Sequence, residues 1–187
     1  MNSKDIALMQ AKIGTTPDGF WGPRSIAACQ QYLRGLMPSR NPWPKADQAS
    51  LTKFYGAPGD ESKLVNMVVD GLGLKYDGKP VKTVRCHQKV AFSLKRIFTE
   101  ISKGPNHDIL NEYAGCFNNR AMRGGSLPSL HARGAAVDLD PDDNGNHLAW
   151  PTRATMPLEV MEAFAREGWV SAGAFWCRDA MHFQATQ

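Results

Sequence analysis

One strongly amphipathic segment constrains the fold more than any other feature of this chain. Between residues 82 and 103, apolar side chains recur at intervals of three and four, which places them on one face of a helix. Gly104-Pro105 then ends the pattern. A helix with a single apolar face must bury that face against another layer of structure. The apolar stripe consists of Val90, Leu94, Ile97, Phe98 and Ile101.

Short extended segments supply that second layer. Alternating apolar residues between 62 and 81, and runs at 109–117, 135–140 and 181–184, indicate strands. A second amphipathic helix is expected over residues 157–168. Because helices and strands follow in mixed order, with hairpin-like pieces late in the chain, we predict an α+β fold in which helices flank a small, largely antiparallel sheet.

The length of 187 residues allows one domain, or one domain with a small appendage. Two helical patterns occupy the first 36 residues, and three prolines follow within seven positions at 38–44. Prolines at this density disfavour both helix and strand and are typical of a linker. We therefore expect a short helical segment at 1–37, a proline-rich linker at 38–53 and the main domain at 54–187.

Composition excludes several classes of protein. Hydrophobic residues make up 42% of the chain and charged residues 21%, which excludes a disordered or collagen-like protein. A net charge of +4 is too weak to indicate nucleic-acid binding, although it favours contact with an anionic surface. No apolar run approaches ~18 residues, so no membrane span is expected, and the polar start is unlike an export signal. The four cysteines form no CxxC pair and are expected as free thiols of a reducing compartment.

Four reactive side chains occur at suggestive spacings. His131 and Asp138 are seven positions apart, so they can converge only if the chain bends at Gly134 between them. Asp179 precedes His182 by three positions, which brings the two together in a turn. Two imidazoles and a carboxylate suit Zn²⁺ and leave one position for water, with Asp179 as a proton acceptor. Taken singly, each pattern is weak, because a lone histidine near an apolar strand is more often a packed core residue, and the HExxH motif is absent.

The residues around these positions resemble a known family. The runs 129–138 and 175–183, with Glu167-Gly168-Trp169 ahead of the second, are similar to the SxHxxGxAxD and Trp…DxMHF pattern of the zinc D-Ala-D-Ala carboxypeptidase and endopeptidase family. That family includes the D,D-dipeptidases of vancomycin resistance and the L-alanyl-D-glutamate endopeptidases of phage endolysins. The resemblance covers residues 54–186 and implies the zinc D,D-peptidase type of α+β fold.

The resemblance also implies zinc as the cofactor and a role for each matched residue. The zinc ligands would be His131, Asp138 and His182, and the catalytic base would be Asp179.

Further residues around the site follow from the same resemblance. Ser129 would support the site, and an upstream arginine would stabilise the oxyanion that forms from the scissile carbonyl. We favour Arg120 for this role, with Arg123 as the alternative. Trp176 would wall the substrate cleft, or else belong to the core.

The N-terminal segment resembles a second family. Gln10 and the run 18–25 are similar to the LQ…DGxFGxxT…AVxxFQ pattern of the helical peptidoglycan-binding module, although the second half of the usual repeat is missing. The resemblance implies that Asp18, Phe20 and Trp21 bind the cell wall. The alternative is that this segment is a structural cap on the enzyme.

A separate acidic run, residues 140–145, opens like a calcium-binding loop. Its twelfth position is Pro151, where such loops carry a bidentate glutamate. We therefore expect a solvated acidic turn rather than a calcium site.

These resemblances together imply a bacteriophage endolysin: a zinc metallopeptidase that hydrolyses an amide bond in the peptide stem or crosslink of bacterial peptidoglycan and lyses the host cell. It would be a monomer, held in the host cytoplasm until a holin or another release factor gives it access to the wall in the periplasm. Two alternatives are a cellular D,D-carboxypeptidase or dipeptidase and a non-catalytic cell-wall binding protein that contains zinc. Which peptide bond is cleaved stays open.

Overall fold

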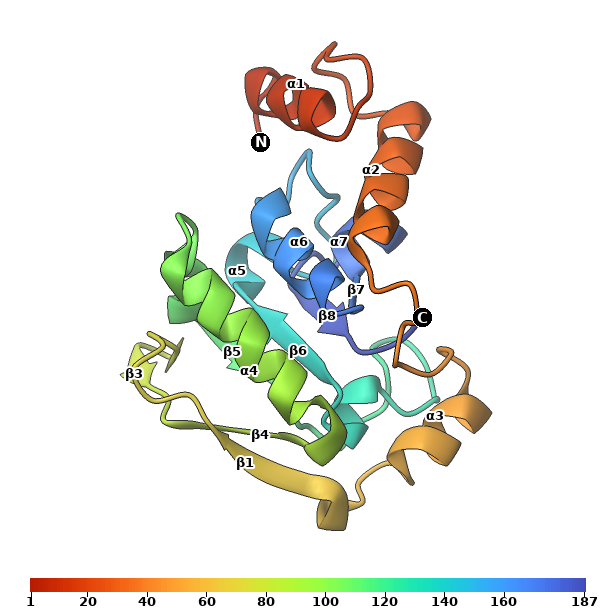
Figure 1. The fold of residues 1–187 in the computed structure, drawn as a ribbon, viewed down its shortest axis with the longest axis vertical. Coiled ribbons are helices and arrows are strands. Elements are labelled where there is room, and N and C mark those ends of the chain that lie inside the picture. The colour runs from red at the N-terminus through yellow and green to blue at the C-terminus, as the bar shows by residue number, and fades with distance from the viewer.

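The computed structural model describes residues 1–187 and shows an α+β fold, as the sequence predicted (Figure 1). Helices of the 3-10 type are labelled η. In chain order the elements are α1 (Ser3–Lys12), α2 (Pro23–Leu36), α3 (Gln48–Tyr55), η1 (Glu61–Lys63), β1 (Leu64–Val68), β2 (Lys75–Tyr76), β3 (Lys79–Pro80), β4 (Thr83–His87), α4 (Gln88–Lys103), η2 (His107–Glu112), β5 (Tyr113–Gly115), η3 (Leu130–Arg133), β6 (Ala136–Leu139), α5 (Pro141–Asn144), α6 (Leu158–Arg166), β7 (Val170–Ser171), α7 (Ala172–Trp176) and β8 (His182–Gln184). None of the helices is both long enough and apolar enough to cross a membrane.

The central element is a four-stranded antiparallel sheet in the order β5-β6-β8-β7. Two further antiparallel pairs, β1 with β4 and β2 with β3, form separate small sheets. Helices α4 and α6 cover one face of the central sheet (Figure 1). Phe98 of α4 packs edge-on against Tyr113 of β5, and Phe164 of α6 stacks on Phe183 of β8. The expected helix-on-sheet core is therefore confirmed.

Helix α4 buries its predicted apolar stripe, but it begins later than the sequence indicated. The prediction of helix was wrong for residues 83–87, which form β4. In that stretch burial alternates, with Val84 and Cys86 inside and Thr83 and Arg85 outside, which is the period of a strand. The side chain of His87 then caps α4 by accepting a hydrogen bond from the backbone N–H of Lys89.

The expected strand at 109–117 was also only partly correct. Residues 107–112 form η2, and the strand is limited to residues 113–115. The expected strands at 135–140 and 181–184 are confirmed as β6 and β8, and the expected helix at 157–168 is confirmed as α6.

The N-terminal helices pack directly on the rest of the protein. Helix α2 lies against α6 and α7, and its buried Cys29 and Leu33 belong to the same continuous core as the sheet (Figure 1). Tyr32 of α2 donates a hydrogen bond to Glu162 of α6, at 3.0 Å. The assignment of residues 1–37 as a separate wall-recognition segment stays a prediction.

Within the predicted linker at 38–53, α3 begins at Gln48 with Asp47 as its N-cap. The preceding proline-rich stretch is fastened to the protein surface. Trp43 is buried and its indole N–H donates to the carbonyl of Glu167 at 2.8 Å, while Asn41 donates to the carbonyl of Gly168 at 2.8 Å. Proline interrupts regular structure here, but the two side chains between the prolines anchor the chain.

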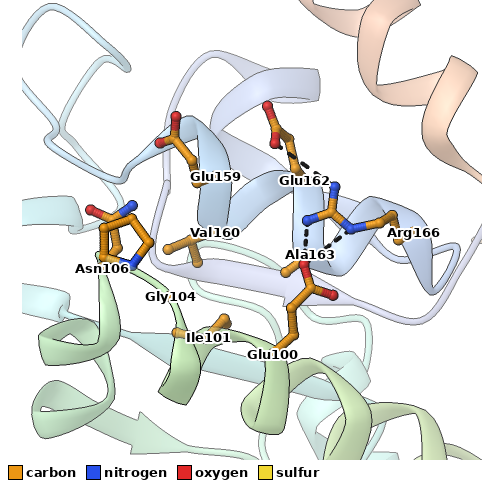
Figure 2. A pocket seen from close by; sticks show the side chains of 10 residues that line it. Glu100, Ile101, Gly104, Asn106, Glu159, Val160, Glu162, Ala163 and Arg166 are labelled. Carbon is orange, nitrogen blue, oxygen red and sulfur yellow. Dashed lines mark hydrogen bonds and ion pairs between the residues drawn. The ribbon is translucent and has the colours of Figure 1, made fainter.

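A network of ion pairs joins α1, α4 and α6. Figure 2 shows Arg166 of α6 between Glu100 of α4 and Glu162 of α6, at the edge of a groove of about 200 Å³. From the other side Lys12 of α1 reaches Glu159 at 2.9 Å and Glu162 at 2.7 Å. Glu162 is the most buried member, because its side chain is only 9% exposed.

Candidate metal centre

Cross-strand pairing brings two of the predicted ligands together. Asp138 of β6 and His182 of β8 are direct partners in the antiparallel register. The third, His131, lies in η3, and the chain reverses at Gly134, whose φ is +63°. A Cβ at Gly134 would lie 2.8 Å from the backbone nitrogen of His87, so only glycine fits this bend. The expected bend is confirmed, and it returns His131 to Asp138.

Three donor atoms converge at this point. His131 Nε2 lies 3.2 Å from His182 Nδ1 and 3.2 Å from Asp138 Oδ1, and His182 Nδ1 lies 3.0 Å from the same Asp138 oxygen. All three residues are buried, with side chains between 4% and 11% exposed. These residues form the one His/Cys/Asp/Glu group whose ligand atoms are close enough to hold a metal ion.

Hydrogen bonds outside the triangle set the tautomer of each imidazole. His131 Nδ1 lies 2.8 Å from the carbonyl oxygen of Cys116, which can only accept, so Nδ1 carries the proton and Nε2 presents a lone pair. His182 Nε2 lies 3.2 Å from Gln184 Oε1. The Gln184 amide nitrogen donates to Thr186 Oγ1 at 2.7 Å, which turns its oxygen toward His182. His182 Nδ1 therefore also presents a lone pair to the centre.

Three inward-facing acceptors repel one another unless a cation lies between them. Two imidazole nitrogens and a carboxylate oxygen, with room for a fourth ligand, are the donor set of a catalytic zinc site. The residues present therefore fit the ion that the sequence predicted.

In the metal-free chain a proton competes for the same position. Burial raises the pKa of Asp138, but hydrogen bonds and charge from His131 and His182 outweigh it and hold that pKa below its usual range. Burial lowers the pKa of His182, but Asp138 outweighs this and raises it. A positive charge is thus favoured at this point even without metal.

Asp179 lies beside the centre with an unused acceptor. Its backbone is left-handed, with φ +58°, and its carbonyl accepts from the backbone N–H of His182 at 2.9 Å, which closes the expected turn. Its Oδ1 is buried without a hydrogen-bond partner. Burial, reinforced by the charge of Asp138, raises the pKa of Asp179. A carboxylate with a raised pKa and a free oxygen is suited to accept and return a proton.

Comparison with known proteins adds one finding to this geometry. Residues 123–185 match the D-alanyl-D-alanine carboxypeptidase family. The matched segment is about a third of the chain and holds the whole triangle and Asp179. No curated protein and no solved structure matches the chain. The match supports a peptidase that acts on peptidoglycan and depends on zinc.

The remaining predicted site residues surround one hollow of about 190 Å³ above the triangle. Ser129 is buried and its Oγ accepts from the backbone N–H of His131 at 3.3 Å, so it caps the turn that carries this ligand. Trp176 is 46% exposed and stacks on the ring of His182, with ring centroids 5.7 Å apart. That position is at the wall of the hollow rather than in the core.

Arginines line the rim of this hollow. Arg120 and Arg123, between which the sequence left a choice, both lie there, and Arg120 donates to the neighbouring carbonyl of Ala121 at 3.2 Å. Sequence reasoning missed Arg178, which also lines the hollow. The available signal was its position directly before Asp179 in the family motif. Sequence reasoning also missed Gln184, two residues after His182, whose side-chain oxygen lies 3.2 Å from His182 Nε2.

The predicted wall-binding residues have different surroundings. Asp18 Oδ1 accepts from the Gln10 side chain at 2.8 Å and from the backbone N–H of Phe20 at 2.9 Å, so it holds the local turn. Trp21 packs edge-on against Trp150, with ring centroids 5.3 Å apart. Phe20 is 72% exposed. Asp18 and Trp21 thus make internal contacts, although Asp18, like Phe20, is exposed and Trp21 is only partly buried.

The acidic run 140–145 serves the fold. Asp140 caps the single turn of α5 by accepting from the backbone N–H of Asp143. Asn144 is fully buried and accepts hydrogen bonds from the backbone N–H groups of Thr155 and Met156. The run therefore ties the loop after β6 to the chain ahead of α6.

Proposed function

We propose that this protein belongs to the D-alanyl-D-alanine carboxypeptidase family and hydrolyses an amide bond in the peptide stem or crosslink of bacterial peptidoglycan with the help of zinc. The observation that carries the proposal is the convergence of three acceptor atoms, from His131, Asp138 and His182, beside the unpartnered carboxylate oxygen of Asp179. Structural zinc sites are closed by four protein ligands, whereas this donor set has three.

Each residue has a definite part in the proposed reaction. Bound zinc would supply a Lewis acid that polarises the amide carbonyl and activates water. Cys116 and Gln184 keep the two imidazoles in the tautomers that can bind a cation. Asp179 takes a proton at Oδ1 and returns it to the leaving amine, for which a raised pKa is an advantage. Arg120, with Arg123 as the alternative, donates N–H groups to the carbonyl oxygen as negative charge develops there.

Within this activity we favour the role of a phage endolysin. The N-terminal likeness to a peptidoglycan-binding module supports it, as do the exposed ring of Phe20 and the net charge of +4, which favours an anionic wall. In that role a monomeric enzyme would leave the host cytoplasm through the action of a holin and reach the wall in the periplasm.

A cellular carboxypeptidase is the second candidate, and the description of the matched family favours it. The two roles differ in the bond that is cut. A carboxypeptidase removes only the terminal residue of a stem, whereas an endolysin cuts within a stem or crosslink and solubilises the wall. A non-catalytic wall-binding protein is disfavoured by Asp179, whose buried free oxygen has no structural partner.

Digestion of purified peptidoglycan by the zinc-loaded protein, followed by mass spectrometry of the products, tests the proposal. We expect new amine and carboxylate ends at one type of amide bond. Asp179→Asn should abolish cleavage while zinc binding, measured separately, persists. Asp142→Asn, which removes an exposed carboxylate outside the hollow, is the matched control. Recovery of intact stems with the zinc-loaded wild type would overturn the proposal in favour of a binding protein.

A further inference from the structure

The hollow above the metal centre holds more positive charge than the proposed chemistry uses. Arg120, Arg123 and Arg178 all line it, and none of them forms an ion pair. Its only carboxylates are Asp138 and Asp179. Asp138 faces the two histidines, and a bound divalent cation would add further positive charge. The hollow is therefore suited to a ligand that carries negative charge.

Arg178 is held at the rim by its backbone. The residues on either side, Cys177 and Asp179, are both left-handed, with φ of +59° and +58°. The carbonyl of Cys177 accepts from the backbone N–H of Trp150 at 3.2 Å, and Arg178 itself forms an isolated antiparallel bridge with Ala149. This backbone leaves Arg178 exposed on the same turn that carries the half-buried Asp179.

Arg123 reaches the hollow from a different part of the chain. It lies in a hairpin-like loop closed by hydrogen bonds from the backbone N–H of Met122 to Leu127, at 2.9 Å, and from Ser129 to Arg120, at 3.0 Å. Its charge contributes to lowering the pKa of Asp179, although burial outweighs it. Two segments far apart in the sequence thus bring free guanidinium groups to the neighbourhood of the same carboxylate.

We propose that Arg178, assisted by Arg123, binds a free carboxylate of the substrate beside the scissile amide, so that the enzyme selects anionic peptides. This inference rests on the proposed peptidase function. A guanidinium presents parallel N–H donors that match a carboxylate, and such charge-assisted pairs are stronger than neutral hydrogen bonds. Peptidoglycan stems offer this group from two sources: the C-terminal carboxylate and the free α-carboxylate of the glutamyl residue. Arg120 stays available for the carbonyl oxygen.

Synthetic stem peptides separate the two sources. One peptide carries both carboxylates free, a second has the C-terminus amidated, and a third has the glutamyl carboxylate amidated. For the peptide with free carboxylates, Arg178→Gln should raise KM roughly 10- to 100-fold and leave kcat within about twofold, as the loss of charge-assisted hydrogen bonds predicts. Amidation of the carboxylate that Arg178 binds should raise the KM of the wild type by a similar factor. Arg178→Gln should then have no further effect on the KM of that amidated peptide.

Two controls make the result specific. Arg178→Lys keeps the positive charge but not the parallel N–H donors of the guanidinium, so its KM should lie between those of the wild type and Arg178→Gln. Arg40→Gln removes another exposed arginine that forms no ion pair and lies outside the hollow. It should leave KM and kcat for all three peptides unchanged. The thermal melting of Arg178→Gln should match the wild type, because Arg178 is exposed.

A binding measurement decides the inference without turnover. Calorimetry with zinc-loaded Asp179→Asn should show the free peptide binding at least tenfold more tightly than the relevant amide, and the added Arg178→Gln change should remove that preference. The inference would be overturned if Arg178→Gln weakened the binding of free and amidated peptides equally, or if the preference for the free peptide survived Arg178→Gln. A wild type that cuts neither peptides nor wall overturns the proposed function instead, and the calorimetry still decides the role of Arg178.

Discussion

Asp138 and His182 are direct partners across the β6–β8 pair, and their Oδ1 and Nδ1 atoms lie 3.0 Å apart. Two of the three ligand atoms are thus fixed by the register of the central sheet, whose backbone hydrogen bonds also hold the core. The third, on His131, depends on a single glycine bend. The register of the sheet and the bend at Gly134 therefore place the three ligand atoms together.

Zinc should raise the thermal stability of the protein. A ligand at a thousandfold excess over its Kd stabilises by about 4 kcal/mol, which for a chain of this length raises Tm by roughly 10 °C. Differential scanning calorimetry with zinc and with a chelator would measure the shift. His182→Ala should lose the zinc response, whereas His107→Ala, at an exposed position, should keep it. A wild type whose Tm is insensitive to zinc would contradict the metal centre.

The support of His182 by Gln184 should be visible in zinc affinity. Gln184→Leu removes the acceptor for His182 Nε2, so the tautomer that presents Nδ1 is no longer favoured, and a loss of about 10- to 100-fold is expected. Thr186→Val removes only the group that orients Gln184 and should have a smaller effect. Competition with a coloured zinc chelator measures both. Equal zinc affinity in wild type and Gln184→Leu would show that the hydrogen bond does not set the tautomer.

Gly134→Ala should lower the free energy of unfolding much more than an alanine at a glycine of similar φ whose Cβ position is unobstructed. Gly134 and Gly78 have φ of +63° and +70°, but only at Gly134 does a Cβ meet backbone atoms, 2.8 Å from the nitrogen of His87. Left-handed strain alone costs on the order of 1 kcal/mol, so Gly78→Ala should lose about that amount. Gly134→Ala should lose at least about 2 kcal/mol and also weaken zinc binding. Urea unfolding of the two variants decides between them.

The difference between what the sequence predicted and what it missed follows from the range of the interactions. The ligand triad and the bend at Gly134 were predictable, because a motif and the chemistry of its residue types are local signals. The carbonyl of Cys116 carries no side-chain signature, so its contact with His131 appears only when the chain is folded. Arg178 was missed although it directly precedes Asp179, because the sequence does not show whether an exposed arginine lines a hollow.

The fold was predictable to a similar degree. The apolar stripe of α4 gave the helix and its buried face, but the start was misplaced because the alternating residues of β4 run directly into it. The anchoring of the proline-rich stretch depends on Trp43 and Asn41 finding carbonyl groups at Glu167 and Gly168. These pairs are more than 120 positions apart in the chain, and no periodicity encodes them.

The free energy of unfolding should fall in mild acid because His87 is buried. Burial lowers the pKa of His87 from its ordinary value of 6.5, while the ring accepts from the Lys89 backbone and bonds the carbonyl of Tyr55. The unfolded chain therefore takes up a proton near pH 6.5 and the folded protein only at lower pH. Stability is fully present above pH 6.5 and declines as the pH falls toward the folded pKa.

The variant His87→Asn isolates this contribution. Asparagine can still cap α4 but does not titrate, so the variant should be less stable at pH 8 and show a weaker loss between pH 6.5 and 5. Both proteins keep the histidines of the metal centre, so the difference between their pH profiles belongs to His87. Parallel profiles from urea unfolding at each pH would contradict the assignment.

The buried carboxylate of Glu162 should control how firmly the N-terminal helices are held. It receives Lys12 of α1 at 2.7 Å and the hydroxyl of Tyr32 of α2 at 3.0 Å, with its side chain 9% exposed. Glu162→Gln leaves Lys12 without its closest partner charge, at an expected cost of about 1–3 kcal/mol. Glu61→Gln breaks an ion pair with Arg85 in which both side chains are about half exposed, and it should cost at most about 1 kcal/mol. Hydrogen exchange and limited proteolysis should show faster opening of residues 1–47 in Glu162→Gln only.

This contrast also bears on what the N-terminal segment is. If α1 and α2 form a structural cap, their release should lower both zinc-dependent activity and the stability of the sheet, because α2 shares the core with α6. If they form a wall-binding module, Glu162→Gln should weaken binding to intact walls while cleavage of soluble stem peptides continues at the wild-type rate. Unchanged protection of residues 1–47 in Glu162→Gln would show that apolar packing at Cys29 and Leu33 holds the segment without the ion pairs.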